Sequence, residues 1–301
     1  MRRFTRSAIV LAVVLTVSLL VWRSLQPDDH AGPCAVVGGV VSLPELPESS
    51  GLAVSRRTPG VLWSHNDSGS AAVLFAIDTA GRVRGRVQIP VRAQDWEDIS
   101  AASCSAGDCL YVADIGDNKL ARRSLQIHRL PEPAAADGHA SPPDTFTATY
   151  ADGPHNAEAL FVVGDDLFIV TRDRTGVVYR STMTALSMTG SSVTGSSMTG
   201  SSMTLTFQRV GEMGLEAVSD AETSRDGTAV VVRTSHEAVL YRTADVIRGR
   251  YVAYQRIPID GLKEPQGEGV ALDDALLYLS SEGRPWNRAG RLLTLQCELP
   301  R

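Results

Sequence analysis

Apolar and polar residues follow one another along the chain in a pattern that recurs roughly every 50 to 60 residues, a period typical of propellers and other repeat folds. Each repeat opens on an acidic residue, continues into a short apolar run, turns, and enters a second apolar run that ends on polar residues. The acidic starts are Glu48, Glu97, Glu158, Glu216 and Glu268. One supersecondary unit repeated in this way predicts a single large β domain.

The repeats divide into strands. The first predicts strands at 52–55, 61–65, 73–77 and 83–89, separated by turns that contain Pro and Gly. The next three predict strands at 99–103, 109–114, 125–130, 145–150, 159–163, 167–171, 177–180, 203–210, 217–221, 229–233, 238–242 and 251–257.

The last repeat predicts only three strands, at 270–272, 276–280 and 291–295. We expect the segment 34–42 to supply its fourth strand, because pairing the two chain ends in one blade closes the ring and removes an open sheet edge. The predicted fold is all-β, a five-bladed β-propeller closed by the N-terminal strand and preceded by one N-terminal hydrophobic helix.

The N-terminus has the composition of a targeting segment. Three arginines precede an uninterrupted apolar run from Ala8 to Trp22, which is of signal-peptide length and short for a membrane span. We assign residues 1–26 to a signal peptide or membrane anchor, 27–33 to a linker and 34–301 to the propeller. Since positively charged residues that flank an apolar segment remain on the cytoplasmic side of the membrane, the propeller is expected to be extracytoplasmic, either anchored to the membrane or secreted. A Ser/Thr/Gly tract within 182–204 predicts a disordered loop.

The cysteines fit that compartment. All of them, Cys34, Cys104, Cys109 and Cys297, lie beyond the apolar run, and paired cysteines are typical of oxidising environments. Cys104 and Cys109 flank a turn between two predicted strands, so a local disulfide is expected. Cys34 then pairs with Cys297 by elimination. A net charge of −5 argues against nucleic acid as a partner, and we expect a monomer.

The acidic starts suggest a chemistry. In a propeller the first strand of each blade lines the central axis, so carboxylates at the strand starts converge on one mouth of the channel. Oxygen ligands at such a place suit a hard cation, calcium above all. The candidate metal ligands are Glu48, Glu97, Asp98, Glu158, Glu216 and Glu268. The alternative is that these side chains only hydrogen-bond the neighbouring blade and brace the ring.

Further polar residues end the second strand of each repeat, on the same face. They are candidates for binding a ligand: Asn66, Asp67, Asp114, Asn118, Asn156, Asp173 and Arg233. The run from Asp114 to Asn118 is the most specific of these, because it crowds carboxylates and an amide around a glycine, although a plain turn also explains it.

Several short motifs resemble one protein group. The residues at 65–69 (His-Asn-Asp-Ser-Gly), 95–99, 114–118, 155–160 and 265–270 are similar to those of secreted or anchored actinobacterial propeller proteins described as like the esterase-like phytase family. The resemblance covers nearly all of the chain after the linker and implies the fold. More distantly, the acidic starts resemble those of calcium-activated nucleotidases, which use an axial calcium. The chain lacks the Lys-rich lining expected of propeller phytases.

Two functions fit these patterns. The first is an extracytoplasmic binding module whose acidic, calcium-binding face recognises a small molecule, glycan or protein. The alternative is a calcium-dependent hydrolase of phosphoesters or similar anionic substrates. In that case a calcium-bound water would attack, Asp117 or His65 would transfer the proton, and Arg172 would stabilise the developing charge. Motifs of serine hydrolases, phosphate-binding loops, zinc proteases and dinucleotide-binding folds are absent from the sequence.

Overall fold

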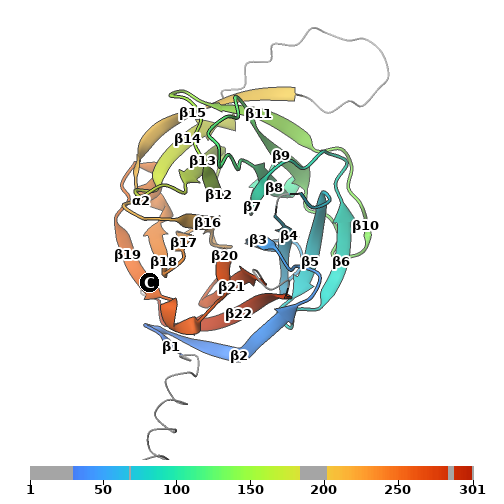
Figure 1. Cartoon of the computed structure of the whole chain (residues 1–301), viewed down its shortest axis with the longest axis vertical. Coiled ribbons are helices and arrows are strands. Elements are labelled where there is room, and N and C mark those ends of the chain that lie inside the picture. Colours follow the sequence, from blue (N-terminus) through green and yellow to red (C-terminus); the bar gives the residue numbers. More distant parts are fainter. Residues whose placement is uncertain (1–29, 68, 184–201, 284–287, 300–301) are drawn as a thin grey trace, which may run out of the picture.

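The computed structural model describes residues 30–67, 69–183, 202–283 and 288–299. Within these residues the protein is built almost entirely of β-strands, which confirms the all-β prediction. The strands form four hydrogen-bonded sheets arranged around a common centre (Figure 1). The predicted N-terminal helix lies outside the described residues. Within the part of the chain that the structure describes, no helix has the length and hydropathy needed to span a bilayer.

The first sheet follows the predicted strands of the first repeat. Its order from the centre outward is β3 (Ser49–Val54), β4 (Val61–Asn66), β5 (Val73–Asp78) and β6 (Val83–Gln88). The two-residue strand β10 (Gly138–His139) then pairs in parallel with β6. The sequence predicted only a loop there, because a strand this short leaves no periodic pattern. The loop packs tightly, since a side chain at Gly85 would overlap the backbone of Ala136.

The second and third repeats share one eight-stranded sheet. The second repeat contributes β7 (Trp96–Cys104), β8 (Gly107–Asp114), β9 (Leu125–Pro131) and β11 (Asp144–Tyr150). The third contributes β12 (Ala157–Val163), β13 (Asp166–Thr171), β14 (Val177–Thr182) and β15 (Ser202–Glu212). Each set is antiparallel, and the two outer strands β11 and β15 join them in parallel. β15 begins inside the segment 182–204, of which residues 184–201 lie outside the described part.

The fourth repeat forms a sheet of its own, with β16 (Val218–Thr223), β17 (Ala229–Thr234), β18 (Glu237–Arg242) and β19 (Ala253–Pro258). A short helix, α2 (Thr243–Ile247), follows β18, and a 3-10 turn, η2 (Asp260–Leu262), follows β19. Neither was predicted, because each is only about one turn long and connects two strands.

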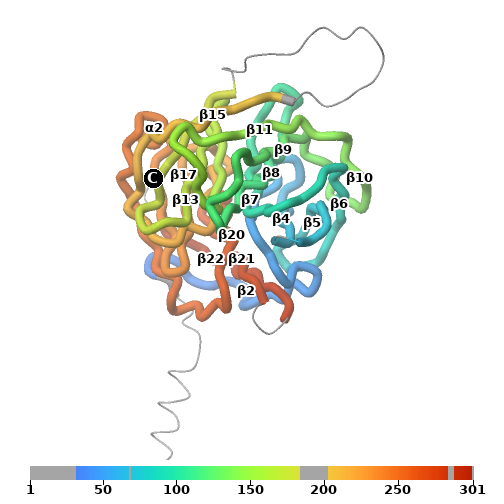
Figure 2. Tube along the Cα trace, turned by 45° about the horizontal axis from the view of Figure 1, so that its top comes forward, coloured from blue at the N-terminus to red at the C-terminus, as the bar shows by residue number. Residues whose placement is uncertain are grey.

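The last sheet joins the two ends of the described chain. It contains β20 (Gln266–Asp273), β21 (Leu276–Glu282), β22 (Gly290–Cys297) and, outside them, β2 (Cys34–Leu43). β2 pairs with β22 as predicted (Figure 2). The short β1 (His30–Ala31), inside the predicted linker, pairs with the start of β2.

Two disulfides are present in the predicted pairing. Cys34, at the start of β2, bonds Cys297, at the end of β22, and so links segments 263 residues apart. Cys104 bonds Cys109 across the turn between β7 and β8. These bonds are consistent with an extracytoplasmic location.

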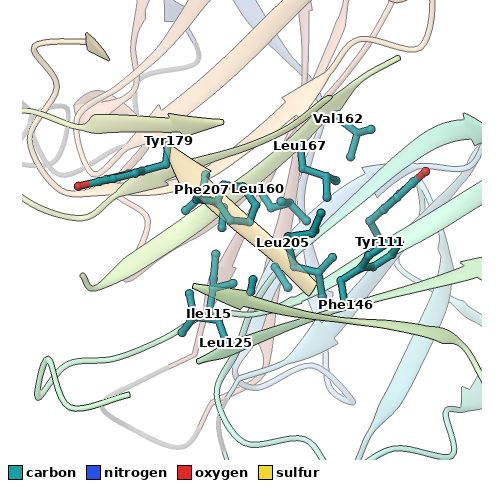
Figure 3. Packing of buried hydrophobic residues seen from close by; sticks show 14 of the residues in the cluster. Tyr111, Ile115, Leu125, Phe146, Leu160, Val162, Leu167, Tyr179, Leu205 and Phe207 are labelled. Carbon is teal, nitrogen blue, oxygen red and sulfur yellow. The ribbon is translucent and has the colours of Figure 1, made fainter. Parts of the chain in front are cut away.

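Hydrophobic clusters fill the spaces between neighbouring four-stranded units. Leu160 and Leu167 of the third repeat pack against Ile115 and Phe146 of the second (Figure 3), and each is fully buried. Comparable clusters lie at the other junctions. Burying one such side chain stabilises the fold by about 1.5–3 kcal/mol. The innermost strands β3, β7, β12, β16 and β20 contact one another in a closed sequence.

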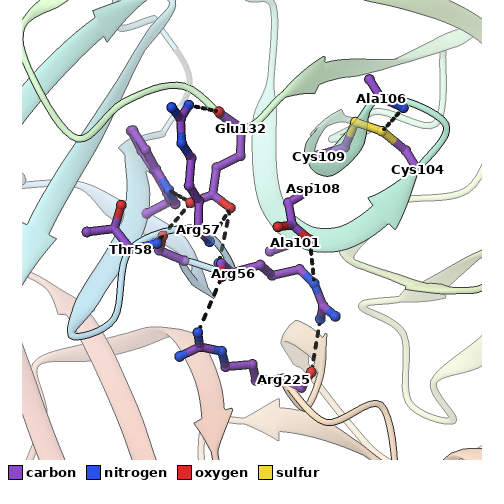
Figure 4. Close-up of polar contacts among 12 residues, drawn as sticks. Arg56, Arg57, Thr58, Ala101, Cys104, Ala106, Asp108, Cys109, Glu132 and Arg225 are labelled. Atoms are coloured by element: carbon purple, nitrogen blue, oxygen red, sulfur yellow. Dashed lines mark hydrogen bonds and ion pairs between the residues drawn. A yellow bond between two sulfur atoms is a disulfide. The ribbon is translucent and has the colours of Figure 1, made fainter.

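Polar contacts also join the repeats, at the end of the ring where β3 finishes (Figure 4). The Glu132 carboxylate, which follows β9, accepts hydrogen bonds from the Trp63 indole at 2.9 Å and from the Arg56 backbone N–H at 3.1 Å. The Arg56 guanidinium donates to the Arg225 carbonyl at 3.1 Å and lies 3.3 Å from Asp108. This end is therefore closed by ion pairs.

Candidate functional site

A polar cavity of about 260 Å³ opens where the inner strands begin; we call it the axial pocket. Its wall carries six carboxylates, one arginine, two amides and one hydroxyl. The residues are Ser50, Asp67, Asp95, Glu97, Asn118, Glu158, Arg172, Gln266, Glu268 and Glu282. This is the acidic mouth that the sequence predicted, but its membership differs from the predicted set.

The inner strands share one local geometry at this pocket. In each, the ladder with the second strand is interrupted by an extra residue, a β-bulge, near the strand start. Beyond the bulge, one backbone N–H from each strand points to a central carboxyl. Those N–H groups belong to Leu52, Ile99, Leu160, Ala221 and Val270. Two residues before them stand Ser50, Glu97, Glu158, Ser219 and Glu268.

Two of the five predicted glutamates therefore fall outside the pocket. Glu48 lies two residues before Ser50 and is half-buried, and Glu216 is exposed ahead of β16. Serines stand at the corresponding positions, and their hydroxyl groups donate hydrogen bonds to the backbone of the neighbouring inner strand. Ser50 Oγ donates to the Glu97 carbonyl at 2.6 Å, and Ser219 Oγ donates to the Glu268 carbonyl at 3.0 Å. Aligning the repeats on their nearest acidic residue missed this register, because serine occupies the glutamate position in these two strands.

The tightest group of carboxylates is Asp67, Asp95 and Glu97. One oxygen from each lies within 4.8 Å of the others, close enough to coordinate one cation. Asp67 follows β4, and Asp95 precedes β7, so two repeats contribute to the group. A side chain at Gly116 would overlap the carboxylates of Glu97 and Asp95. Glycine at this position therefore makes room for them.

Burial and charge act together on the pocket. Glu97 is 7% exposed, and its burial, together with the charges of Asp67, Asp95 and Glu268, raises its pKa to about 10. Burial also raises the pKa of Glu268. The positive charge of Arg172 lowers the pKa of both glutamates. Carboxylates held this close are stable in their ionised form only beside a counter-charge.

Arg172, which directly follows β13, is the one cation among the described residues that line the axial pocket. Its Nη1 forms an ion pair with Glu158 and lies 3.7 Å from Glu268 Oε2. Its side chain is 30% exposed, whereas the carboxylates of Glu158 and Glu268 are almost fully buried. The guanidinium therefore contacts Glu158 and Glu268, which are not part of the group of Asp67, Asp95 and Glu97.

Asp98, predicted as a metal ligand, lies deeper than the axial pocket and braces the ring. Its Oδ2 accepts from the Leu160 N–H at 2.6 Å, and Asp220 Oδ2 accepts from the Leu52 N–H at 3.1 Å. Burial and the charge of Asp220 raise the pKa of Asp98. Asp98 and Asp220 therefore hold the inner strands together, as the bracing alternative expects, and they form a layer below the cavity. Glu97, Glu158 and Glu268 face the cavity itself.

Of the three residues predicted for catalysis, only Arg172 reaches the axial pocket. His65 is fully buried, its ring contacts Trp96 edge to face at 5.5 Å, and burial lowers its pKa. The Asp117 carboxylate accepts hydrogen bonds from the N–H groups of Ala121 and Arg122 at 2.9 and 2.8 Å. It shapes the loop before β9, as the turn interpretation of the 114–118 run expects.

Of the predicted ligand-binding residues, Asp67 and Asn118 line the axial pocket. The Asn66 amide oxygen instead accepts from the Glu48 N–H at 3.1 Å. The Asp114 carboxylate pairs with Arg122 at 2.7 Å and accepts from the Gln94 N–H at 2.8 Å. Asp114 therefore positions the segment that carries Asp95.

The remaining three also hold the backbone. The Asn156 amide oxygen accepts from the Asp117 N–H at 2.8 Å, and Asp173 accepts from the Gly176 N–H at 2.9 Å. Arg233 is 1% exposed and donates to the Gly269 carbonyl at 2.8 Å. Short polar side chains at strand ends commonly satisfy turn N–H groups, and the contacts of Asn156 and Asp173 are of this kind.

Four pocket residues were not among the predicted ligands: Ser50, Asp95, Gln266 and Glu282. A signal for three of them existed. Asp95 and Gln266 each precede a pocket glutamate by two residues, and alternate residues of a strand face the same side. Gln266 Nε2 donates to Glu268 Oε1 at 2.8 Å. Glu282 ends the second strand of the last repeat, the position that marked the other ligand candidates, whereas Ser50 left no such signal.

Comparison with known proteins gives only distant similarities. No family model matches the chain, and no curated protein matches it. One similar solved structure is titled "Crystal structure of Nidogen/Laminin Complex", with a TM-score of 0.43 and 12% identity over 77% of this chain and 72% of that one. Another, "Crystal Structure of Mitotic Checkpoint Complex", has a TM-score of 0.37 and 9% identity over 85% of this chain and 65% of that one. Similarity at this level says nothing about what the chain binds.

Proposed function

We propose that this protein is an extracytoplasmic five-bladed β-propeller whose axial pocket binds a hard divalent cation, calcium above all, and through it a ligand. The architecture is supported by the antiparallel four-stranded units and by the ring of contacts among β3, β7, β12, β16 and β20. The eight-stranded sheet counts as two blades, because the pairing of β11 with β15 is parallel and joins two outer edges.

The observation that carries the cation proposal is the group of Asp67, Asp95 and Glu97. Oxygens from three carboxylates converge within 4.8 Å, beside a glycine whose missing side chain leaves room for them. Calcium prefers oxygen ligands at 2.3–2.6 Å and accepts irregular geometry. Asn118 and Gln266 add amide groups on the pocket wall.

Binding is better supported than hydrolysis. The hydrolase alternative needed His65 or Asp117 to transfer a proton, and neither lines the axial pocket. The ligand would be a small molecule, a glycan or a segment of a protein that completes the coordination of the cation. The location outside the cytoplasm is supported by the two disulfides and by the Arg-rich, apolar N-terminal sequence. The motif resemblance to secreted or anchored actinobacterial propellers points the same way.

Calcium titration tests this proposal. A ligand that binds only the folded state stabilises it by about 2.7 kcal/mol at a hundredfold excess over its dissociation constant. We expect the full-length chain to melt at a higher temperature in calcium than in chelator. The double variant Asp95→Asn with Glu97→Gln should lose this difference and remain folded.

The matched control is Asp137→Asn with Glu212→Gln, which removes two exposed carboxylates remote from the pocket and should keep the wild-type response. Identical melting of the wild-type chain in calcium and in chelator would refute the cation proposal. A panel of phosphoesters and carboxylic esters, assayed with and without calcium, tests the hydrolase alternative separately.

A further inference from the structure

The guanidinium of Arg172 lies between two carboxylates of the axial pocket that stand outside its tightest group. The tight group is Asp67, Asp95 and Glu97, and the other two are Glu158 and Glu268. Arg172 Nη1 pairs with Glu158 and lies 3.7 Å from Glu268 Oε2. It therefore contacts the second pair and is not part of the tight group of three.

From this arrangement we infer that Arg172 is a built-in counter-cation that limits the axial pocket to one metal ion. The inference rests on the proposed function and deepens it, since it assigns the number of ions and the half of the pocket that holds the ion. Arg172 acts as a specificity-determining residue and not as a ligand.

The electrostatics support this division. Arginine keeps its charge at any physiological pH, and its planar fork can contact two carboxylates at once. A guanidinium tethered by the chain occupies its place without the loss of freedom that a free ion suffers on binding.

Removing the charge would leave Glu158 and Glu268 buried without a counter-charge. Glu158 is 6% exposed and Glu268 is 4% exposed. A pair of ionised carboxylates at this depth is unfavourable unless a cation binds or one of them is protonated. In the presence of calcium, a second ion would take the vacated position, because both glutamates keep their oxygens in place on the bulged starts of β12 and β20.

The experiment is isothermal titration of the chelator-stripped, full-length chain with calcium. We expect one ion per wild-type chain and two per Arg172→Gln chain. The matched control is Arg174→Gln, which removes an exposed arginine two residues away on the same loop and should leave the count at one. A triple variant, Arg172→Gln with Glu158→Gln and Glu268→Gln, keeps the shape of the pocket without these charges and should bind one ion.

The outcomes separate the two proposals. If wild type and Arg172→Gln both bind one ion with the same affinity, Arg172 does not set the number and the inference fails while the proposed function stands. If wild type binds two ions, the same conclusion follows. If neither protein binds calcium, both proposals fail. If Arg172→Gln does not fold, the triple variant is compared with wild type instead. One ion bound by each protein would show that the first site does not need the charges of Glu158 and Glu268.

Discussion

The carboxyl groups of Asp98 and Asp220 together accept hydrogen bonds from the backbone of all five inner strands. Asp98 accepts from β7, β12 and β16, and Asp220 accepts from β3 and β20. The donors are the N–H groups of Ile99, Leu160, Ala221, Leu52 and Val270, at 2.6, 2.6, 3.5, 3.1 and 2.5 Å. Both residues are 0% exposed. These two side chains fasten the ring at its centre, directly below the axial pocket.

Replacing Asp98 separates its role as an acceptor from its role as a charge. Asp98→Ala should lower the free energy of unfolding by about 1–3 kcal/mol for each backbone N–H left without a partner. Asp98→Asn should lose less than Asp98→Ala, because its single amide oxygen can still accept from Leu160 and Ala221, while its NH₂ group cannot accept from the Ile99 N–H. Chemical denaturation measures both values. Equal losses in the two variants would show that the charge, and not the hydrogen bonding, fastens the strands.

His128 should make the fold less stable in mild acid. It is 1% exposed, and burial lowers its pKa to about 4. As pH falls below the ordinary value of about 6.5, the unfolded chain takes up a proton that the folded chain does not. Stability should therefore fall between pH 6.5 and 4, by up to about 3 kcal/mol from this residue.

The variant His128→Gln tests this assignment by unfolding measured across that pH range. Its stability should fall less steeply than that of wild type, although His65 shifts in the same direction and keeps part of the slope. The control is His236→Gln, since His236 is exposed and Asp260 raises its pKa, so that its effect has the opposite sign. An unchanged slope in His128→Gln would contradict the assignment.

The fold was predictable from the sequence because apolar runs such as Val230-Val231-Val232 and Leu277-Tyr278-Leu279 have few alternatives to buried strands. The strand that pairs the chain ends could also be predicted, since the last repeat was short by one strand and Cys34 needed a partner. These predictions depend on composition and spacing, so an error of one or two residues in register does not change them.

The pocket was only partly predictable, because a site depends on which way each side chain points. The acidic pattern marks Glu48 as the start of the first repeat, but Ser50 stands at the position that Glu97, Glu158 and Glu268 occupy in their strands. Likewise, Asp98 and Glu97 are neighbours in the sequence, but Asp98 accepts hydrogen bonds from three inner strands and Glu97 lines the cavity. Asp220, which accepts from the other two inner strands, lies inside a strand whose acidic start was read at Glu216.

The two disulfides should contribute unequally to stability. Loss of the Cys34–Cys297 bond, by replacing both residues with serine, should lower the free energy of unfolding by roughly 2–5 kcal/mol, because it closes a very long loop in the unfolded chain. The Cys104–Cys109 bond closes a loop between residues only five apart, so its removal should have the smaller effect. Denaturation of the two double-serine variants compares them directly, and a larger loss from the short loop would contradict this reasoning.

Gly116 should be required for cation binding and not for folding. An alanine methyl group there would overlap the carboxylates of Glu97 and Asp95, so these side chains would have to move apart. The backbone itself would tolerate alanine, because Gly116 does not have a positive φ. A movement of a few tenths of an ångström or more away from the shared position weakens coordination, since calcium–oxygen distances span only about 2.3–2.6 Å.

We therefore expect Gly116→Ala to weaken calcium binding at least about tenfold, equivalent to about 1.4 kcal/mol, with little change in the melting temperature measured in chelator. The control is Gly138→Ala, because a side chain at Gly138 would meet nothing within 4 Å. It should bind calcium as wild type does. Calorimetric titration of the three proteins gives the dissociation constants. If Gly116→Ala binds calcium with wild-type affinity, the ion does not sit between Asp95 and Glu97, and the assignment of the first site to this group is wrong.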